Sequence, residues 1–192
     1  MIEWVSIGKR YGRRVLFAGL SGRLESGAPL VVTGANGCGK STFLRILAGL
    51  LRPDAGQVRI ARADLRLGYA APDVDLYGEM TGRENLAFLS RVTGLHADLD
   101  AALREAGLAA ASNRLVGRYS SGMRQRLKLA AAAIGQPDVL ILDEPTLALD
   151  EDGAAFVETI IARQIERGGC LAIATNDADE ARRWQRATVN LG

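Results

Sequence analysis

Residues 34–41, Gly-Ala-Asn-Gly-Cys-Gly-Lys-Ser, restrict the fold of this chain more than any other feature. They follow the apolar run of residues 30–33 and precede a stretch of helical composition over residues 41–51. The spacing G-x-x-x-x-G-K-S connects a buried strand to a helix and lets successive backbone N–H groups turn toward one phosphate. A glycine-rich turn with an incidental lysine is the alternative, but both flanking elements favour a phosphate-binding loop.

This phosphate loop, residues 34–41, supplies the first candidate site residues. We expect Lys40 to contact the β- and γ-phosphates of ATP as a point charge, and Ser41 to place its hydroxyl on Mg²⁺. The N-terminus of the following helix adds a positive end to the loop. The candidate nucleotide ligands here are Gly34, Ala35, Asn36, Gly37, Cys38, Gly39, Lys40, Ser41 and Thr42.

A second candidate site lies where the apolar run of residues 139–142 ends in Asp143-Glu144-Pro145. Ligands of open α/β sheets gather at the carboxyl ends of the strands, so this run delivers two carboxylates to that edge. We expect Asp143 to hold Mg²⁺, directly or through water. Glu144 is expected to polarise the water that attacks the γ-phosphate. The alternative is that Asp143 only caps a turn before Pro145.

Apolar runs alternate with helical patterns along the chain, which predicts an α/β fold. Buried strands are expected at residues 30–33, 139–142 and 170–175, and a brief β-like segment at 58–69. Helices are expected over residues 82–94, 98–106, 122–134 and 151–167, the first with a capping box between Thr81 and Glu84. The pattern is that of a P-loop NTPase: a mainly parallel sheet core, a short antiparallel β region, and a helical subdomain inserted at about residues 73–130.

Length and composition narrow the class of protein. The 192 residues suffice for one sizeable domain, expected to span residues 1–192. A net charge of +2 is too small to indicate nucleic-acid binding. Two cysteines without metal spacing suit a reducing compartment. No signal peptide and no long uncharged apolar stretch are recognised, so we expect a cytoplasmic protein unless a partner holds it at a membrane.

At this point the chain resembles the ATP-binding subunit of ABC transporters. The signature segment, residues 119–126, reads Tyr-Ser-Ser-Gly-Met-Arg-Gln-Arg and resembles the family's L-S-G-G-Q followed by Q-R. Residues 147–150 resemble its D-loop, and Asn85-Leu86 completes a T-x-x-E-N-L pattern that begins at Thr81. Tyr11 is placed where the family has an aromatic ring that stacks on adenine, although a packing role is the alternative.

The resemblance implies an assembly. Two copies, or one copy and a homologue, would face head to tail as an ATP-dependent homodimer or heterodimer with two ATP molecules between them. Each ATP would lie on one copy's phosphate loop and beneath Ser120 and Gly122 of the other, with Asp150 nearby. A multi-span membrane subunit would dock on the helical subdomain and residues 72–77. That partner would hold the chain at the inner face of the membrane.

Three departures from the family pattern bear on mechanism, one of them Ser121 for a glycine and Met123 for a glutamine in the signature. Pro72 falls where the family has a glutamine that contacts Mg²⁺, and it offers no side-chain ligand; a shift by one residue would bring Asp73 there. Asn176 replaces the family's switch histidine, and its amide can reach a γ-phosphate oxygen without passing a proton. The one histidine, His96, falls in the helical middle. Because Lys40 and Glu144 remain, we expect hydrolysis to survive and to depend on the partner.

Two other functions stay open. One is a soluble ABC ATPase without a membrane partner. The other is a weakly hydrolysing, nucleotide-dependent regulator, for which Pro72 and Asn176 are the support. Among transporters, the short chain is similar to the ATP-binding subunit of the haem exporter of cytochrome c biogenesis. Exporters of lipids, polysaccharides or drugs share the Y-S-S-G-M form of the signature. The substrate contacts the membrane subunit, so this chain carries no signal for it.

Overall fold

The computed structural model describes residues 2–62, 64–94, 97–184 and 187–191. The strands are β1 (Ile2–Tyr11), β2 (Arg14–Leu24), β3 (Pro29–Thr33), β4 (Ala55–Ile60), β5 (Leu67–Ala70), β6 (Val139–Asp143), β7 (Cys170–Ala174) and β8 (Ala187–Asn190). The helices are α1 (Lys40–Leu47), α2 (Gly82–Thr93), α3 (Leu99–Glu105), α4 (Ser121–Ala133), α5 (Glu151–Glu166) and α6 (Ala178–Trp184). Two short 3₁₀ turns, Ala109–Ala111 and Val116–Arg118, precede α4.

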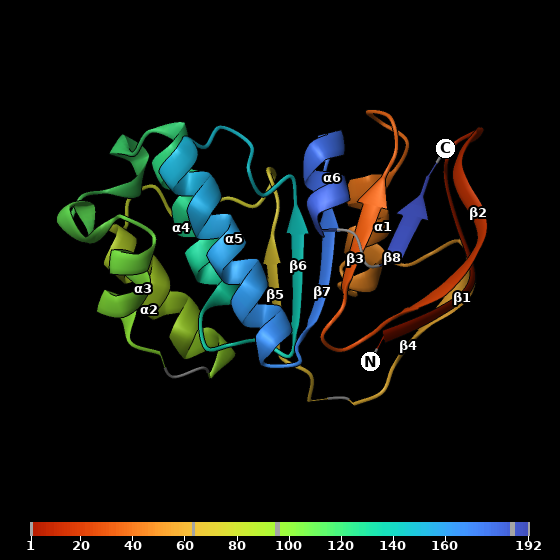
Figure 1. Ribbon diagram of the computed structural model, residues 1–192, viewed down its shortest axis with the longest axis horizontal. Helices are drawn as coiled ribbons and strands as arrows, with labels where there is room; N and C mark the ends of the chain where they lie inside the picture. Colours follow the sequence, from red (N-terminus) through yellow and green to blue (C-terminus); the bar gives the residue numbers. More distant parts are fainter. Residues whose placement is uncertain (1, 63, 95–96, 185–186, 192) are drawn as a thin grey trace.

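The central sheet is parallel and has the strand order β5-β6-β7-β3-β8. All of its strands point toward one edge, the carboxyl edge, as the arrowheads in Figure 1 show. Strand β7 lies between β3 and β6, although it comes last of the three in sequence. The segments that follow β3, β7 and β6 therefore lie next to one another at the carboxyl edge.

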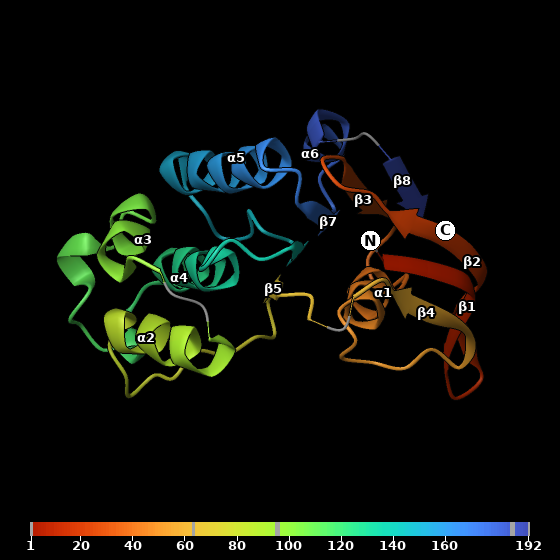
Figure 2. The same cartoon turned by 90° about the horizontal axis from the view of Figure 1, so that it is seen from below.

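Both faces of this sheet are buried, which explains why its strands are continuous apolar runs. Leu140 and Leu142 pack in one core, with α5 and α6, while Val139 and Ile141 pack in a second core with α1. The period of two follows from the alternation of side chains along a strand. Figure 2 shows α5 and α6 on one side of the sheet and α1 on the other.

A second, antiparallel sheet has the order β2-β1-β4 and covers α1. Its Trp4 is buried and meets Phe43 of α1 edge to face, with ring centroids 5.4 Å apart. The segment expected to be β-like over residues 58–69 is divided: β4 pairs with β1, and β5 joins the parallel sheet. Strands β1 and β2 have no counterpart among the expected elements, and neither does α6.

Helices α2, α3 and α4 form a helical region beyond β5, at the left of Figure 1. The expected capping box is present: Glu84 N donates to Thr81 Oγ1 at 3.2 Å, and Thr81 N donates to Glu84 Oε2 at 2.8 Å. Asp98 caps α3 and Ser120 caps α4. Across the described ranges, with their gaps at 63, 95–96 and 185–186, no helix has the length and apolar character needed to cross a bilayer.

Candidate functional site

The phosphate loop has the backbone that its glycines predict. Gly34, Gly37 and Gly39 have φ values of 144°, 76° and 115°, a region that other residues rarely adopt. A Cβ at Gly34 would lie 2.6 Å from the Cys38 sulfur, so this close approach also requires glycine. Helix α1 begins directly afterwards, at Lys40. The loop therefore combines a tight turn with the positive end of a helix, as anion binding requires.

Lys40 lies beneath this loop and is 6% exposed. Its ammonium group donates to the carbonyl oxygens of Gly34, at 2.9 Å, and Ala35, at 3.3 Å. It also donates to the side-chain oxygen of Asn176, which follows β7. These contacts hold the cation within the loop, where a bound phosphate would compete for the same N–H donors.

Asp143, the last residue of β6, is 1% exposed, and neither carboxylate oxygen has a hydrogen-bond partner. Burial raises the pKa of this carboxyl, and the negative charge of Asp73 adds to the effect. The Ser41 hydroxyl lies close enough to oppose the rise in pKa, although its geometry falls short of a hydrogen bond to either oxygen. A buried carboxylate without partners, beside a hydroxyl, is a donor set that fits Mg²⁺.

Ser41 and Asp143 alone supply too few ligands for a metal ion. Within the described residues no group of three or more histidine, cysteine or acidic side chains could hold a metal ion. Mg²⁺ is usually held by one or two protein ligands together with phosphate oxygens and waters. Ser41 and Asp143 therefore suit a cation that arrives with a nucleotide rather than one held by protein ligands alone.

Glu144 turns the chain sharply at the end of β6, with a φ of 47°. Its Oε2 accepts a hydrogen bond from Asn176 N at 3.3 Å, while Oε1 is buried without a partner. Burial raises the pKa of Glu144, and the Asn176 N–H and the charge of Lys40 oppose the rise. A carboxylate with a raised pKa and a free oxygen is suited to accept a proton from water.

The strand order explains why these five residues meet. Lys40 and Ser41 follow β3, Asn176 follows β7, and Asp143 and Glu144 end β6. These strands are neighbours, and their carboxyl ends share one edge. Residues separated by more than 100 positions in the chain thus lie within hydrogen-bonding distance, as the contact between Lys40 and Asn176 demonstrates.

Three of the expected nucleotide ligands lie at the starts of helices instead of joining this cluster, and two of them, Ser120 and Asp150, are N-caps. The Ser120 hydroxyl accepts from Met123 N at 3.2 Å, and Gly122 lies in the first turn of α4. Asp150 Oδ1 accepts from Gly153 N at 2.9 Å and begins α5. In the part of the chain that the structure describes, no hydrogen bond connects these residues to the phosphate loop. Ser120 and Asp150 are exposed, so both remain accessible to a second molecule.

Tyr11 ends β1 and is 52% exposed, with the Lys9 ammonium 5.8 Å from its ring centroid. Its partner across the hairpin is Arg14, whose guanidinium donates to Gly37 O at 2.9 Å. The hairpin that carries Tyr11 is thus tied to the phosphate loop through Arg14, and the ring of Tyr11 is exposed. The contact between Arg14 and Gly37 could not be predicted from the sequence, because it spans 23 positions and belongs to no short motif.

The loop after β5 is held from two sides. Lys128 of α4 donates to the carbonyl oxygen of Pro72 at 2.9 Å. Asp73 forms an ion pair with Arg45 of α1. Asp73 is thus engaged by Arg45, and its charge also acts on Asp143. His96 lies outside the described residues.

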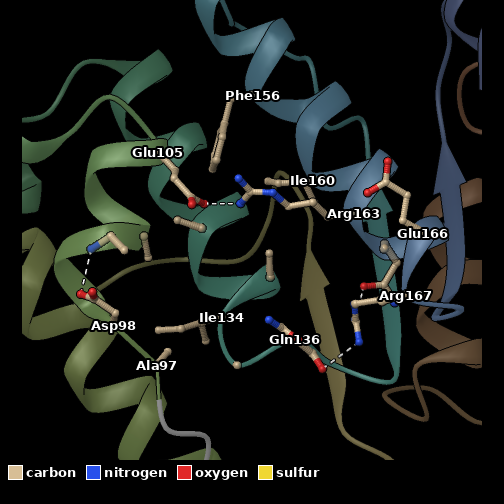
Figure 3. A pocket seen from close by; sticks show the side chains of 16 residues that line it. Ala97, Asp98, Glu105, Ile134, Gln136, Phe156, Ile160, Arg163, Glu166 and Arg167 are labelled. Atoms are coloured by element: carbon tan, nitrogen blue, oxygen red, sulfur yellow. Dashed lines mark hydrogen bonds and ion pairs between the residues drawn. The ribbon is translucent and has the colours of Figure 1, made fainter.

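A large cavity is found elsewhere in the molecule. Figure 3 shows it between α3, α4 and α5, with a volume of about 840 Å³ and an ion pair between Glu105 and Arg163 across it. None of the expected site residues lines this cavity.

A phosphate loop, two carboxylates and the amide of Asn176 at one edge of a parallel sheet define a nucleoside-triphosphate-binding α/β protein. The chain belongs to the ABC transporter family, whose model matches residues 17–147. It is 37% identical, over 187 residues, to the daunorubicin resistance ATP-binding protein DrrA3 of Streptomyces coeruleorubidus. It is 35% identical, over 196 aligned residues, to the Nod factor export ATP-binding protein I of Burkholderia orbicola (strain AU 1054).

The extent of each match differs between this chain and its relatives. The two alignments cover 90% and 95% of this chain, but 59% and 64% of DrrA3 and the Nod factor protein. Among solved structures, the dimeric bacterial ABC transporter cassette MJ0796 matches with a TM-score of 0.87 and 23% identity. That match covers 100% of this chain and 94% of the cassette, and it shows that the fold is shared.

Proposed function

We propose that this chain is the ATP-binding and ATP-hydrolysing subunit of a membrane transporter. The observation that carries the proposal is the cluster of Lys40, Ser41, Asp143, Glu144 and Asn176 at the carboxyl edge, with three buried carboxylate oxygens that lack partners. Such oxygens are costly to bury unless a ligand engages them. The named functions of the relatives, drug resistance and Nod factor export, favour outward transport.

The proposed chemistry assigns one task to each side chain. Lys40 exchanges its carbonyl partners for β- and γ-phosphate oxygens, and the amide of Asn176 contacts the γ-phosphate. The free oxygen of Glu144 accepts a hydrogen bond from the attacking water and draws away its proton. Mg²⁺, held by Ser41 and Asp143 together with the phosphates, would neutralise charge that develops on the leaving oxygens.

The other half of the site comes from a second cassette. Ser120 and Gly122 lie at the N-terminus of α4, where a hydroxyl and backbone N–H groups can donate to a γ-phosphate. Neither is bonded to the phosphate loop of its own chain, which suits a role toward a second copy or a homologue. Asp150 and the exposed Tyr11 complete this shared surface, with Tyr11 beneath the adenine.

The membrane subunit is proposed to dock on the helical region. Tyr77 and Phe88 are partly exposed aromatic side chains in edge contact, with ring centroids 5.2 Å apart, and Val92 of α2 is 67% exposed. Beside them is a small cavity of about 220 Å³ that includes Tyr77 and Leu89 in its lining. An apolar surface beside a hollow suits a short amphipathic helix of a membrane protein. Such docking would place this chain at the cytoplasmic face of the membrane.

The test is Glu144→Gln, which keeps the shape of the side chain and removes its basic oxygen. We expect hydrolysis of Mg²⁺-ATP to fall about 100-fold or more, as losses of a general base typically do. With saturating ATP, the variant should move from monomer to dimer on size-exclusion chromatography. An ATPase rate equal to that of the wild type, measured with the membrane partner present, would overturn the assignment of Glu144.

A weakly hydrolysing regulator is the second candidate, and Pro72 is the observation that favours it. Its carbonyl is engaged by Lys128 and it has no side-chain ligand to offer to a metal. In that case nucleotide binding would still drive dimerisation. Wild-type and Glu144→Gln proteins would then show the same slow turnover, with or without the partner.

A further inference from the structure

We infer that Gln125 is a positioning residue that couples helix α4 to the backbone of Glu144. The inference rests on the proposed function, since it concerns the geometry of the proposed base. Gln125 lies in the signature segment, one turn after Ser120, and no role was assigned to it from the sequence. Gln125 would connect the start of α4, which is proposed to contact the ATP bound by the other cassette, with Glu144, which is proposed to activate water at the ATP bound by its own phosphate loop.

The connection consists of two hydrogen bonds. Gln125 is 7% exposed, and its amide Nε2 donates to Pro145 O at 3.0 Å and to Glu144 O at 3.4 Å. Both acceptors are backbone carbonyls of the turn that ends β6. A buried amide that loses such partners leaves polar groups unsatisfied, so these bonds constrain the distance between α4 and the turn.

The turn itself needs support. Glu144 is not a glycine, yet its φ of 47° lies in the left-handed region, which costs energy unless neighbouring contacts hold it. Glu144 N donates to Ala174 O at 2.9 Å, and Leu147 N donates to Glu144 O at 3.2 Å. These bonds anchor the turn to β7 and to its own chain, while Gln125 anchors it to α4.

Helix α4 is fixed against the same edge at two further points. Lys128, three residues after Gln125, donates to Pro72 O at 2.9 Å. A Cβ at Gly122 would lie 3.1 Å from Ala148 O, so the first turn of α4 lies close against the loop after β6. On its far side, α3 and α5 are separated by the cavity of Figure 3 and bridged by the Glu105–Arg163 ion pair. A displacement of α4 would therefore be transmitted to the turn at Glu144.

A buried glutamine can also serve stability alone, and the chain contains a matched control. Gln164 of α5 is 3% exposed and donates to Pro137 O at 3.2 Å and Cys170 O at 2.8 Å. Its amide nitrogen, like that of Gln125, meets two backbone carbonyls, and its Oε1 also accepts from Arg167, but it lies at the opposite end of the strands. Comparing the two positions separates a positioning role from a structural one.

The experiment compares Gln125→Met with Gln164→Met, because methionine retains length and flexibility and removes the amide. Both variants should unfold at lower urea concentration than the wild type. We expect Gln125→Met to lower kcat for ATP hydrolysis by about tenfold or more while KM and the Kd for ATP stay within about twofold. Gln164→Met should keep kcat within about twofold of the wild type.

A milder variant, Gln125→Asn, is too short to reach both carbonyls and should lower kcat by about threefold or more if the methionine variant fails to fold. Equal kcat losses at positions 125 and 164, or a loss at 125 that appears in KM alone, would overturn the inference. A wild-type protein whose hydrolysis does not depend on Glu144 would instead overturn the proposed function, and the positioning role with it.

Discussion

The ammonium group of Lys40 donates hydrogen bonds to two loop carbonyls and to the Asn176 side chain. These bonds offset the cost of burying a charge. In the proposed function, nucleotide binding at this loop would therefore exchange partners of Lys40 rather than add contacts to a free cation. Because Asn176 carries no ionisable proton near neutral pH, this exchange does not depend on the protonation of a switch residue, as it would with histidine.

Cys38 provides a direct test of how tightly the loop is built. Its sulfur lies against Gly34, and the Cys38 N–H donates to Ala35 O at 3.1 Å. An added maleimide must distort the loop, so we expect alkylation to weaken ATP binding by about tenfold or more, and bound ATP to slow the alkylation.

The control for this experiment is internal. Cys170 is 3% exposed and should not react in the folded protein, so labelling should vanish in Cys38→Ser. Full modification of Cys38 that leaves the affinity for ATP unchanged, measured by equilibrium titration, would show that the loop tolerates the added group.

At the level of single elements, helix α2 depends on its first turn. Thr81 and Glu84 satisfy each other's backbone N–H groups. The Thr81 N–H and hydroxyl both donate to Glu84 Oε2 and lower the pKa of that carboxyl. We expect Thr81→Ala to lower the free energy of unfolding by about 1 kcal/mol in urea denaturation. Thr81→Ser keeps the hydroxyl and should lose less than half as much; equal losses would mean that the methyl group, not the cap, matters.

Elements whose signal is local could be predicted from the sequence. The capping box, the phosphate loop and the run that ends in Asp143 are contiguous patterns, and each lies where it was expected. Strands β1 and β2 were not expected, because register shifts interrupt their pairing and disturb the alternation of apolar residues. The contacts of Arg14 and Gln125 were also out of reach, since their partners lie 19 to 23 positions away and are backbone carbonyls, which any residue could supply.

At the scale of the whole molecule, the sheet order assembles the site from segments that no single motif contains. The expected fold, a mainly parallel sheet with a small antiparallel sheet and a group of helices, is confirmed. That residues 1–192 make one domain with a helical insertion at about 73–130 stays a prediction. The roles assigned to Ser120, Asp150 and Tyr11 also stay predictions. They concern contacts with a second cassette and with the adenine ring of ATP, which only a structure of the ATP-bound dimer would show.

The same assembly divides the carboxylates into two groups with opposite effects on stability. Burial raises the pKa of Asp143 and Glu144, so their ionisation opposes folding above those pKa values and the opposition is relieved as pH falls. Hydrogen bonds lower the pKa of a second group, whose stabilisation is present above an unfolded pKa of about 4 and is lost below it. This group comprises Asp54, Asp64, Glu84, Asp98, Asp138 and Asp177.

The nucleotide-free protein should therefore become more stable as pH falls from neutrality toward the unfolded carboxyl pKa of about 4, and less stable below it. Asp143→Asn removes a buried charge at nearly constant volume, so we expect it to raise the free energy of unfolding at neutral pH by on the order of 1 kcal/mol. It should also flatten the gain above about pH 4, while the loss at lower pH remains. Urea denaturation with a chelator, across this pH range, measures both limbs. Parallel plots of unfolding free energy against pH for the wild type and the variant would mean that Asp143 is not the source of the gain in stability. The buried charge of Asp143 would then not be a cost to stability that the binding site imposes.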